Sequence, residues 1–359
     1  MSLDRPALAL RGGPREAQRR TATLFKRHQN FALLILFLAL FAFFSFFTRR
    51  FFSAPNIEDI LSGYSFMAIL AVGQAFPIMT RGLDLSIGSN VGLGAMILFD
   101  LDKVFHLPGW ASIPISVTAC ALAGCVNGLL VTQLKLQPFV ATLATLAAFR
   151  GTVYAVSGRQ LYPELATQSV KDPWIRSLEG FLDIGHLTGL SRFVRLPSLP
   201  FSFLALLVVA VLAHVVLNRT RLGLNLKTVG GNPEAAHLAG VSVRRTQIVA
   251  YLACGLCAGI VAVLLVARFT TATEATGTGM ELTTIAAAVI GGVTLRGGSG
   301  TVAGPILGAF LLGIILIGLT LMGISQFTQQ ILTGAILLGA VYYDRLTSDR
   351  QKSASGGVA

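Results

Sequence analysis

Residues that could do chemistry are few in this sequence. Cys254 and Cys257 form a C-x-x-C pair, a spacing typical of metal or redox sites, but no second pair or histidine cluster accompanies them. The histidines are also not paired at the spacing of helical metal ligands. They are His28, His106, His186, His214 and His237. We therefore interpret the two cysteines as small packing residues and predict no metal site.

The glycine-rich stretch at 297–304 lacks the lysine that a nucleotide-binding P-loop requires. In the motif Gly-x-x-x-x-Gly-Lys-Ser/Thr, that lysine pairs with the β- and γ-phosphates. The stretch here reads Gly-Gly-Ser-Gly-Thr-Val-Ala-Gly and contains no lysine. The sequence therefore predicts a protein that is not an enzyme, holds no cofactor and does not hydrolyse ATP itself.

Asp84 is the main ionisable residue inside an apolar region. Leu83 and Leu85 flank it, and Ser86 and Ser89 follow closely. A charged side chain in a membrane segment is costly, so it usually marks a functional site. We therefore treat this polar stretch as a candidate part of a translocation pathway.

Only Arg150 and Glu281 accompany Asp84 within, or at the start of, apolar blocks. These are too few for the carboxylate relay of a proton-driven carrier or for the charged rings of an ion channel. A pathway for a neutral polar solute fits these few charged residues better than either of those two functions. The candidate hydrogen-bonding side chains are Ser65, Gln74, Thr142 and Thr145. Taken singly, each of them is more often a helix-packing residue.

These residues sit in a chain with the composition of a membrane protein. Of its 359 residues, 53% are hydrophobic and 12% are charged, whereas a soluble domain carries about 25% charged residues. Apolar runs near the length of about 20 residues that crosses a bilayer recur along the chain. They are continuous, unlike the alternating strands of a β-barrel. The sequence therefore predicts an all-α polytopic membrane protein.

We predict about ten membrane-spanning helices in a domain at 31–345. They cover roughly 31–47, 64–79, 90–99, 110–131, 139–156, 199–216, 248–267, 282–293, 303–322 and 327–343. A long polar segment, 157–198, follows the fifth helix. A basic loop, 217–247, follows the sixth.

Basic residues indicate the orientation, because Lys and Arg collect in cytoplasmic loops. This rule accounts for the net charge of +12 without nucleic acid binding. The tail at 1–30, the loop at 217–247 and the tail at 346–359 carry such residues, so we expect all three in the cytoplasm. Six helices separate the first tail from the loop, an even number, as that placement requires. Segment 157–198 then faces the periplasm.

Two polar, glycine-rich breaks indicate that the domain consists of two related halves. The first break, 78–88, contains Arg-Gly shortly before Asp84, and the second, 293–304, contains Arg296-Gly297. Broken helices in matching positions of two halves point to a transport site. Two ordinary turns between helices explain the pattern equally well.

The basic loop contains a short, well-capped helix. Asn232 is a typical N-cap residue, Pro233 suits the first helical position, and Glu234 is favourable in the first turn. A run of alanines continues the helix, and Gly240 ends it. Such a rigid helix at a membrane face is suited to docking a soluble partner. A solvated connector with no partner is the alternative.

Four segments, in this order, resemble one family. Gly230–Val241 is similar to the EAA coupling segment of bacterial ABC-importer permeases. Thr80–Ser89, Asn127–Leu143 and Ala288–Gly304 resemble three segments of the branch that imports ribose, xylose and galactose, which also includes the autoinducer-2 permeases. The similarity covers most of 60–345.

The resemblance implies a multi-pass permease of the bacterial inner membrane, worked by other proteins. Two permease subunits, identical or related, would form the pathway, two ATPase subunits would dock beneath, and a periplasmic binding protein would deliver a sugar. The implied ATPase-coupling residues are Gly231, Asn232, Pro233, Glu234, Ala235, Ala236 and Gly240. The signature residues, which either line the pathway or hold the helices together, are Asp84, Ser86, Gly88, Ser89, Arg296, Gly297, Gly298, Ser299 and Gly300.

Two other functions stay open at this stage. A secondary carrier or facilitator would need no ATPase, and a membrane scaffold would use the basic loop to recruit a partner with other chemistry. For an ABC permease, a ribose-like monosaccharide is the expected solute. Autoinducer-2 and a branched-chain amino acid are the alternatives.

Overall fold

The computed structural model describes residues 14–157, 169–182 and 198–355, and most of these residues are helical. The helices are α1 (Pro14–Phe47), α2 (Ala54–Met79), α3 (Ile87–Lys103), α4 (Gly109–Gln133), α5 (Pro138–Val156), α6 (Pro173–Ser177), α8 (Phe201–Arg219), α9 (Arg221–Gly231), α10 (Pro233–Leu238), α11 (Val243–Phe269), α12 (Met280–Ile290), α13 (Ala303–Leu321) and α14 (Gln326–Ser355). Two short strands, β1 (Phe181–Leu182) and β2 (Leu199–Pro200), pair antiparallel.

The structure confirms a helical membrane protein. Six helices of the described part are long and apolar enough to cross a bilayer, namely α2, α4, α5, α8, α11 and α13. The apolar part of α1, Phe31–Phe47, and the whole of α12 are apolar but shorter. Each of the ten expected segments falls mainly on one helix.

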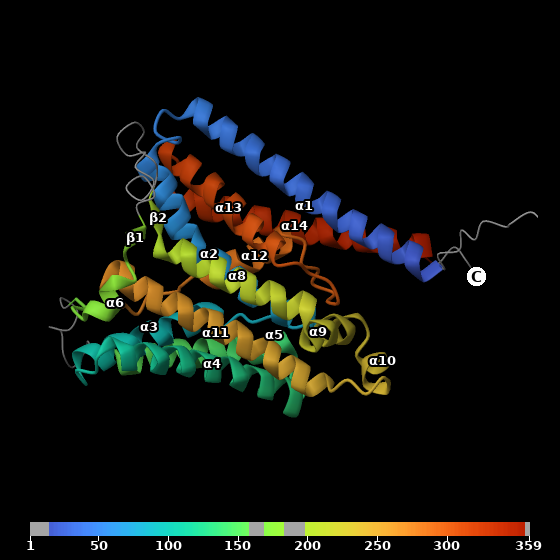
Figure 1. Cartoon of the computed structure of the whole chain (residues 1–359), viewed down its shortest axis with the longest axis horizontal. Coiled ribbons are helices and arrows are strands. Elements are labelled where there is room, and N and C mark those ends of the chain that lie inside the picture. Colours follow the sequence, from blue (N-terminus) through green and yellow to red (C-terminus); the bar gives the residue numbers. More distant parts are fainter. Residues whose placement is uncertain (1–13, 158–168, 183–197, 356–359) are drawn as a thin grey trace, which may run out of the picture.

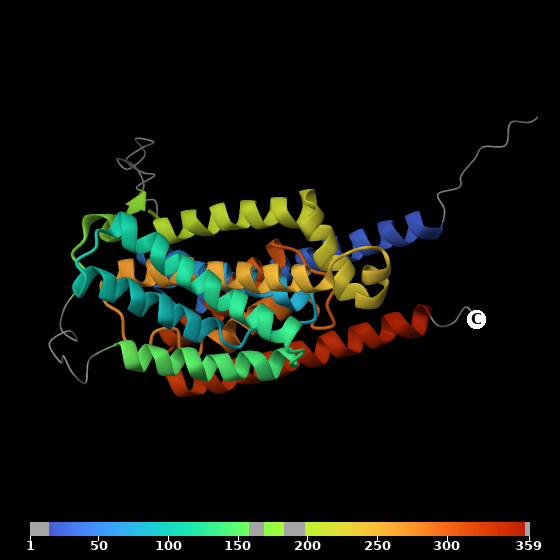
Figure 2. The ribbon, with the colours of Figure 1, turned by 90° about the horizontal axis from the view of Figure 1, so that it is seen from below.

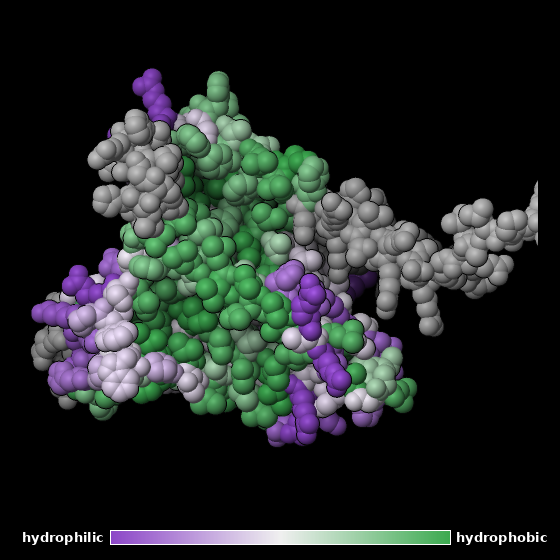
Figure 3. Space-filling view, in the orientation of Figure 1, coloured by the Kyte–Doolittle hydropathy of each residue, from purple (hydrophilic) through white to green (hydrophobic). Residues whose placement is uncertain are grey.

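The long helices run side by side between two polar ends (Figures 1 and 2). The start of α1, the pair α9 and α10, and the last turns of α14 lie together at one end, which we call the α10 end. Helix α6 and the two strands lie at the opposite end, the β1–β2 end. On the face seen in Figure 3, apolar residues cover the middle and hydrophilic residues gather at the two ends.

Helices α4 and α11 pack through glycines on both sides. Gly124 and Gly128 of α4 and Gly255 and Gly259 of α11 form two G-x-x-x-G pairs. A Cβ atom on Gly124 would overlap the carbonyl oxygen of Tyr251 and lie 3.0 Å from Cα of Gly255. Small residues at this spacing let two membrane helices approach backbone to backbone. Helix α11 is thereby fixed against α4.

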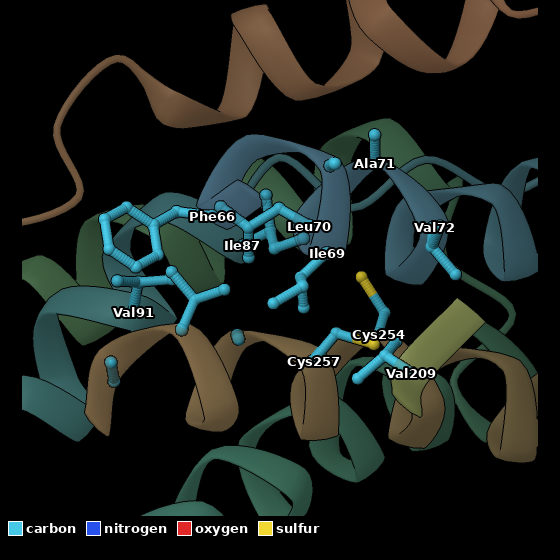
Figure 4. Close-up of a cluster of buried hydrophobic side chains, with 14 of the residues drawn as sticks. Phe66, Ile69, Leu70, Ala71, Val72, Ile87, Val91, Val209, Cys254 and Cys257 are labelled. Atoms are coloured by element: carbon cyan, nitrogen blue, oxygen red, sulfur yellow. The ribbon is translucent and has the colours of Figure 1, made fainter. Parts of the chain in front are cut away.

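The hydrophobic core lies between α11 and helices α2, α3 and α8, and Figure 4 shows part of it. Cys254 and Cys257 are free, buried and packed among these apolar side chains, as expected for packing residues. Within the described ranges, no three His, Cys, Asp or Glu side chains are grouped so that they could hold a metal ion.

The loop at 217–247 is more helical than expected. The sequence analysis anticipated α10 but not α9, which begins directly after α8. Thr220 caps α9 by accepting a hydrogen bond from Gly223 N (3.4 Å), and Leu226 and Val229 bury its inner face. Lys227 of α9 donates to the carbonyl of Leu217 (3.1 Å), near the end of α8, and partial burial lowers the pKa of its ammonium.

The polar segment 157–198 falls largely outside the described residues. Its described part contains α6, which Asp172 caps by accepting hydrogen bonds from the backbone of Trp174 and Ile175, and the strand β1. The tails at 1–13 and 356–359 lie outside the described residues as well.

The close contact of Gly124 with α11 allows a prediction about stability. Gly124→Ala should lower the thermal midpoint of the detergent-solubilised protein, because overpacking of this kind costs about 1–3 kcal/mol. Gly63→Ala is the matched control, since a Cβ on Gly63 of α2 meets nothing within 4 Å. That control should be unchanged or slightly more stable, because Ala is the better helix former. Equal midpoints for both variants would show that the α4–α11 contact is not tight.

Candidate functional site

Helix α10 has the caps that its sequence predicts. The Asn232 side-chain oxygen accepts hydrogen bonds from the backbone N–H groups of Glu234 (3.0 Å) and Ala235 (3.1 Å). Gly240 adopts φ = +79°, and the Val241 N–H then donates to the carbonyl of Ala236 (2.9 Å). This left-handed glycine and backward hydrogen bond form a C-cap that satisfies the last carbonyls. The predicted helix is thus confirmed, whereas its role stays a prediction.

Most of α10 faces outward at the α10 end (Figure 1). Ala236 is buried and anchors the helix, while Glu234, Ala235 and His237 are exposed. Leu238 is 87% exposed, which leaves a large apolar side chain uncovered at a polar end. An acidic group and a leucine on one short, rigid helix are suited to a protein partner.

The first break separates α2 from α3 and carries Asp84 in the interior. Asp84 is fully buried, and its Oδ1 accepts hydrogen bonds from Ser86 N (2.9 Å), Ser86 Oγ (2.6 Å) and Asn127 Nδ2 (3.2 Å). The first two bonds fold the carboxylate back over the start of α3. There the free N–H groups of the helix favour a negative charge.

A hydrogen-bond network continues from Asp84 into α4 and α5. Asn127 of α4 donates to Ser86 Oγ (2.7 Å) and accepts from Thr145 Oγ1 of α5 (2.6 Å). Thr142 donates to the carbonyl of Leu83 (3.1 Å). These side chains are all buried, and each makes at least one hydrogen bond within the network or to the backbone, whereas Oδ2 of Asp84 has no hydrogen-bond partner in the part of the chain that the structure describes. In this structure they join the first break to two membrane helices.

The other residues of the first signature lie within α3. Ser89 donates to the carbonyl of Ser86 (2.8 Å), one turn back. Gly88 lies so close to Glu281 and Gly277 that any side chain there would overlap both. The segment between α11 and α12 therefore packs directly against the start of α3.

The second break separates α12 from α13 and is shaped by glycines. Gly297 and Gly298 have φ values of +79° and +77°, which favour glycine. Thr294 Oγ1 lies 3.1 Å from Ser299 Oγ and donates to the carbonyl of Gly297 (3.2 Å). Arg296 is exposed.

Two breaks that are far apart in sequence touch in space. The N–H group of Gly298 donates to the carbonyl oxygen of Met79, at the end of α2 (2.9 Å). Gly298 also lies against Gly231, the last residue before the N-cap of α10. The structure thus brings Gly231, Gly297 and Gly298 into one group, while Asp84 and Ser86 belong to another group with Asn127.

Sequence reasoning had not singled out two of the residues that make these contacts. Asn127 was noted only within a segment that resembles the family, although an amide in an apolar helix is a signal in itself. Arg81 was noted only as part of an Arg-Gly pair, and in the structure it reaches α9. Of the four candidate hydrogen-bonding residues, Thr142 and Thr145 join the network, whereas Ser65 bonds to the carbonyl of Leu61 in its own helix.

Comparisons with known proteins identify relatives of the same kind. Residues 56–341 match the family described as branched-chain amino acid transport system / permease component. The chain is 32% identical over 278 residues to the ribose import permease protein RbsC of Escherichia coli, a match that covers 77% of this chain and 82% of RbsC. No solved structure gave a significant match.

Two further relatives have other solutes in their names. The chain is 35% identical over 294 residues to the galactose/methyl galactoside import permease protein MglC of Escherichia coli, covering 78% of this chain and 83% of MglC. It is 31% identical over 288 residues to the autoinducer 2 import system permease protein LsrC of Photorhabdus luminescens, covering 80% of this chain and 81% of LsrC.

These matches extend over most of the chain and agree with the helical membrane architecture. Such a permease is not catalytic and holds no cofactor, because a partner ATPase uses the ATP and a binding protein supplies the solute. The chain therefore belongs to the family of branched-chain amino acid transport system permease components, as the permease component of an ABC importer of the sugar and autoinducer-2 type.

Proposed function

We propose that this chain forms the membrane pathway for a monosaccharide, with α10 as the docking point of the ATPase. The observation that carries the proposal is the geometry of α10. Its own hydrogen bonds hold it rigid, its exposed face carries Glu234 and Leu238, and Ala236 anchors it to the rest of the molecule. A secondary carrier or a facilitator has no ATPase to bind, so its function does not require such an exposed docking helix.

Ten crossings with the α10 end in the cytoplasm form part of the proposal. Exposed Arg219, Arg221, Arg244 and Arg245 lie next to α9 and α10, and such residues prefer the cytoplasmic side. Both ends of the described chain, where α1 begins and α14 ends, lie at the same end of the molecule (Figure 1). The β1–β2 end, with α6, then faces the periplasm.

Each of the two expected halves would contribute one pair of helices separated by a break, α2 and α3 in the first half and α12 and α13 in the second. Helix α3 has 17 residues and α12 has only 11. At 1.5 Å per residue, α12 is about 16 Å long, whereas the hydrocarbon core of a bilayer is about 30 Å thick. The non-helical parts of the two breaks, 80–86 between α2 and α3 and 291–302 between α12 and α13, adjoin these short helices, as expected for helices that are interrupted at a transport site.

A neutral polar solute is favoured by the interior. Oδ1 of Asp84 is already bonded to Ser86 and Asn127, and no salt bridge joins Asp84 to a cation in the described residues, so the interior offers no charged pair for an ionic solute. The names of three relatives specify ribose, galactose or methyl galactoside, and autoinducer 2. A ribose-like monosaccharide is therefore our first candidate, and a branched-chain amino acid, the solute in the family description, is the second.

A second permease subunit would complete the pathway by packing on α5 and α14. Ala144, Ala148, Gly151 and Ala155 of α5 form an exposed stripe of small residues, a surface that lets another membrane helix approach closely. Phe327, Ile331 and Leu338 of α14 are 73% to 80% exposed. The two helices lie along the same side of the molecule in Figure 2. We propose a homodimer or a dimer with a related chain.

Uptake by the reconstituted system tests the function directly. Proteoliposomes that contain this chain with its ATPase, and that are supplied with its binding protein, should accumulate radiolabelled ribose or a related sugar only when ATP is inside. Omitting ATP, the ATPase or the binding protein should each abolish uptake. Uptake by the permease alone, driven by an ion gradient, would support a secondary carrier instead, and uptake of leucine in place of sugars would correct the solute.

Reversing the charge on α10 tests the docking site. Glu234→Lys should weaken binding of the ATPase by about tenfold or more, because charged contacts at an interface are typically worth 1.4 kcal/mol or more. The variant should still insert into the membrane, since Glu234 is exposed. Binding can be measured by co-purification and by titration of the purified ATPase.

Glu179→Lys supplies the matched control for that experiment. It makes the same charge change on an exposed glutamate at the β1–β2 end. This variant should bind the ATPase normally. Equal loss of binding by both variants, or normal binding by Glu234→Lys, would count against α10 as the docking point.

A bulky residue in the α5 stripe tests the dimer. Gly151→Leu should shift the purified permease from dimer toward monomer, by about tenfold in the dissociation constant, because it blocks close helix approach. Nothing lies within 4 Å of a Cβ at Gly151, so the monomer itself should be unaffected. Thr118→Leu, on the exposed side of α4, is the control. The mass of the particle, measured by light scattering, would remain dimeric in both variants if α5 is not at the interface.

A further inference from the structure

Three backbone segments meet at the α10 end, next to the start of α10. They are the end of α2 at Met79, the second break at Gly297 and Gly298, and the end of α9 at Gly230 and Gly231. The Gly298 N–H donates to the Met79 carbonyl (2.9 Å). A Cβ atom on Gly230 would overlap that same carbonyl oxygen, and one on Gly298 would lie 2.9 Å from Cα of Gly231. The three backbones are therefore in direct contact, with no room for intervening side chains.

Arg81 ties this junction together from the first break. Its Nε donates to the carbonyl of Gly230 (2.6 Å), and its Nη2 donates to the carbonyl of Gly231. These two carbonyls are at the C-terminal end of α9, where the helix dipole favours a cation. A guanidinium is suited to this task, because its rigid fork of donors can bind two acceptors at once.

The backbone of Arg81 is itself held in an unusual conformation. Its φ is +65°, in the left-handed region that residues other than glycine seldom adopt. Its N–H donates to the carbonyl of Ile78 (3.0 Å), and the next N–H, of Gly82, donates to the carbonyl of Pro77 (2.8 Å). A Cβ on Gly297 would lie only 2.7 Å from Cγ of Arg81. Both breaks thus enclose the arginine side chain at its base.

The residue that follows this junction is the N-cap of α10. Gly231 leads directly into Asn232, whose side chain closes the first turn of α10. Only this N-cap residue separates α10 from the carbonyls that Arg81 binds. A displacement of α10 would therefore pull on Arg81, on the end of α2 and on the second break together.

We propose that Arg81 is a positioning residue that couples movement of α10 to the two glycine-rich breaks. This inference rests on the proposed function, because it assigns the ATPase to α10. Arg81 is exposed in the cleft beside α10, but its Nε and Nη2 are bonded to carbonyls within the chain. We therefore assign the docking contact to the exposed face of α10, and the transmission of displacement into α2, α3, α12 and α13 to Arg81. Loss of Arg81 should leave the ATPase bound and hydrolysing ATP, but it should separate hydrolysis from transport.

The experiment uses the reconstituted permease–ATPase complex with its binding protein. It measures ATPase co-purification, ATP hydrolysis and solute uptake for wild type, Arg81→Ala, Arg81→Lys and Gly298→Ala. For Arg81→Ala we expect wild-type co-purification and an approximately tenfold lower uptake per ATP hydrolysed, the factor expected for losing a charge-assisted hydrogen bond. Arg81→Lys should be intermediate, because one ammonium replaces a fork that binds two carbonyls. Gly298→Ala should resemble Arg81→Ala, because it forces the junction apart.

Arg244→Ala is the control variant. Arg244 lines the same cleft beside α10 as Arg81 does, together with Lys135 and Gln247, and is exposed. Removing it changes the local charge equally but leaves both carbonyl bonds intact. It should keep the wild-type ratio of uptake to hydrolysis.

Several results would overturn the inference. One is a wild-type ratio of uptake to hydrolysis in Arg81→Ala, and another is an equally lowered ratio in Arg244→Ala. A third is a parallel loss of complex formation, hydrolysis and uptake in Arg81→Ala, as a purely structural role predicts. If Arg81→Ala is not inserted in the membrane, Arg81→Lys becomes the test, and a wild-type ratio of uptake to hydrolysis in that variant would also overturn the inference. Failure of the wild-type complex to take up any solute with ATP would instead refute the proposed function, and the inference with it.

Discussion

Direct backbone contact at glycines is the constraint on which the rest of this structure depends. Lipid provides no hydrophobic drive to bring membrane helices together, so close packing and satisfied polar groups must do so. Gly124 of α4 meets Gly255 of α11, Gly128 lies against Ile248 of α11, and Gly259 lies against Val117 of α4. A methyl group at any of these four glycines would press on the opposing helix. With α4 and α11 fixed, Asn127, the neighbour of Gly128, lies where it can bind Asp84.

The same kind of contact recurs where the two glycine-rich breaks meet. Gly230, Gly298 and the carbonyl of Met79 leave no space for side chains between three segments. Contacts of this type transmit displacement well, because packed backbones have few ways to yield. The Asp84 network differs, since it joins helices through side chains that are all buried and hydrogen-bonded. The structure therefore combines one backbone junction beside α10 with one hydrogen-bonded side-chain network among α3, α4 and α5.

Local features of the structure could be predicted from the sequence, whereas its distant pairings could not. The caps of α10 depend on Asn232, Pro233 and Gly240, which act within a few residues, and the structure confirms them. Asn127 binds Asp84 across 43 residues, and Arg81 binds Gly230 across 149. Neither partner can be chosen without knowing which helices are neighbours. Helix α9 was missed because its short apolar pattern lies in a basic stretch that resembles a loop.

Family resemblance added a function to residues that local rules had already singled out. Asp84 and Ser86 stood out as polar residues in an apolar region, and Gly297 and Gly298 as part of a glycine-rich break, but neither the local rules nor the resemblance said what they touch. The structure shows that Ser86 and Asp84 bind each other and Asn127, and that Gly298 binds the end of α2. The separation into two groups emerges only in three dimensions.

The shape of α10 is encoded almost wholly within residues 232–241, because its caps lie in the same segment and only Ala236 is buried. A segment that folds by its own bonds can be exchanged as a unit between homologous chains without repacking the helices around it. With α10 as the proposed docking point, replacing these ten residues would pair such a permease with a different ATPase and leave the membrane helices that surround the solute unchanged.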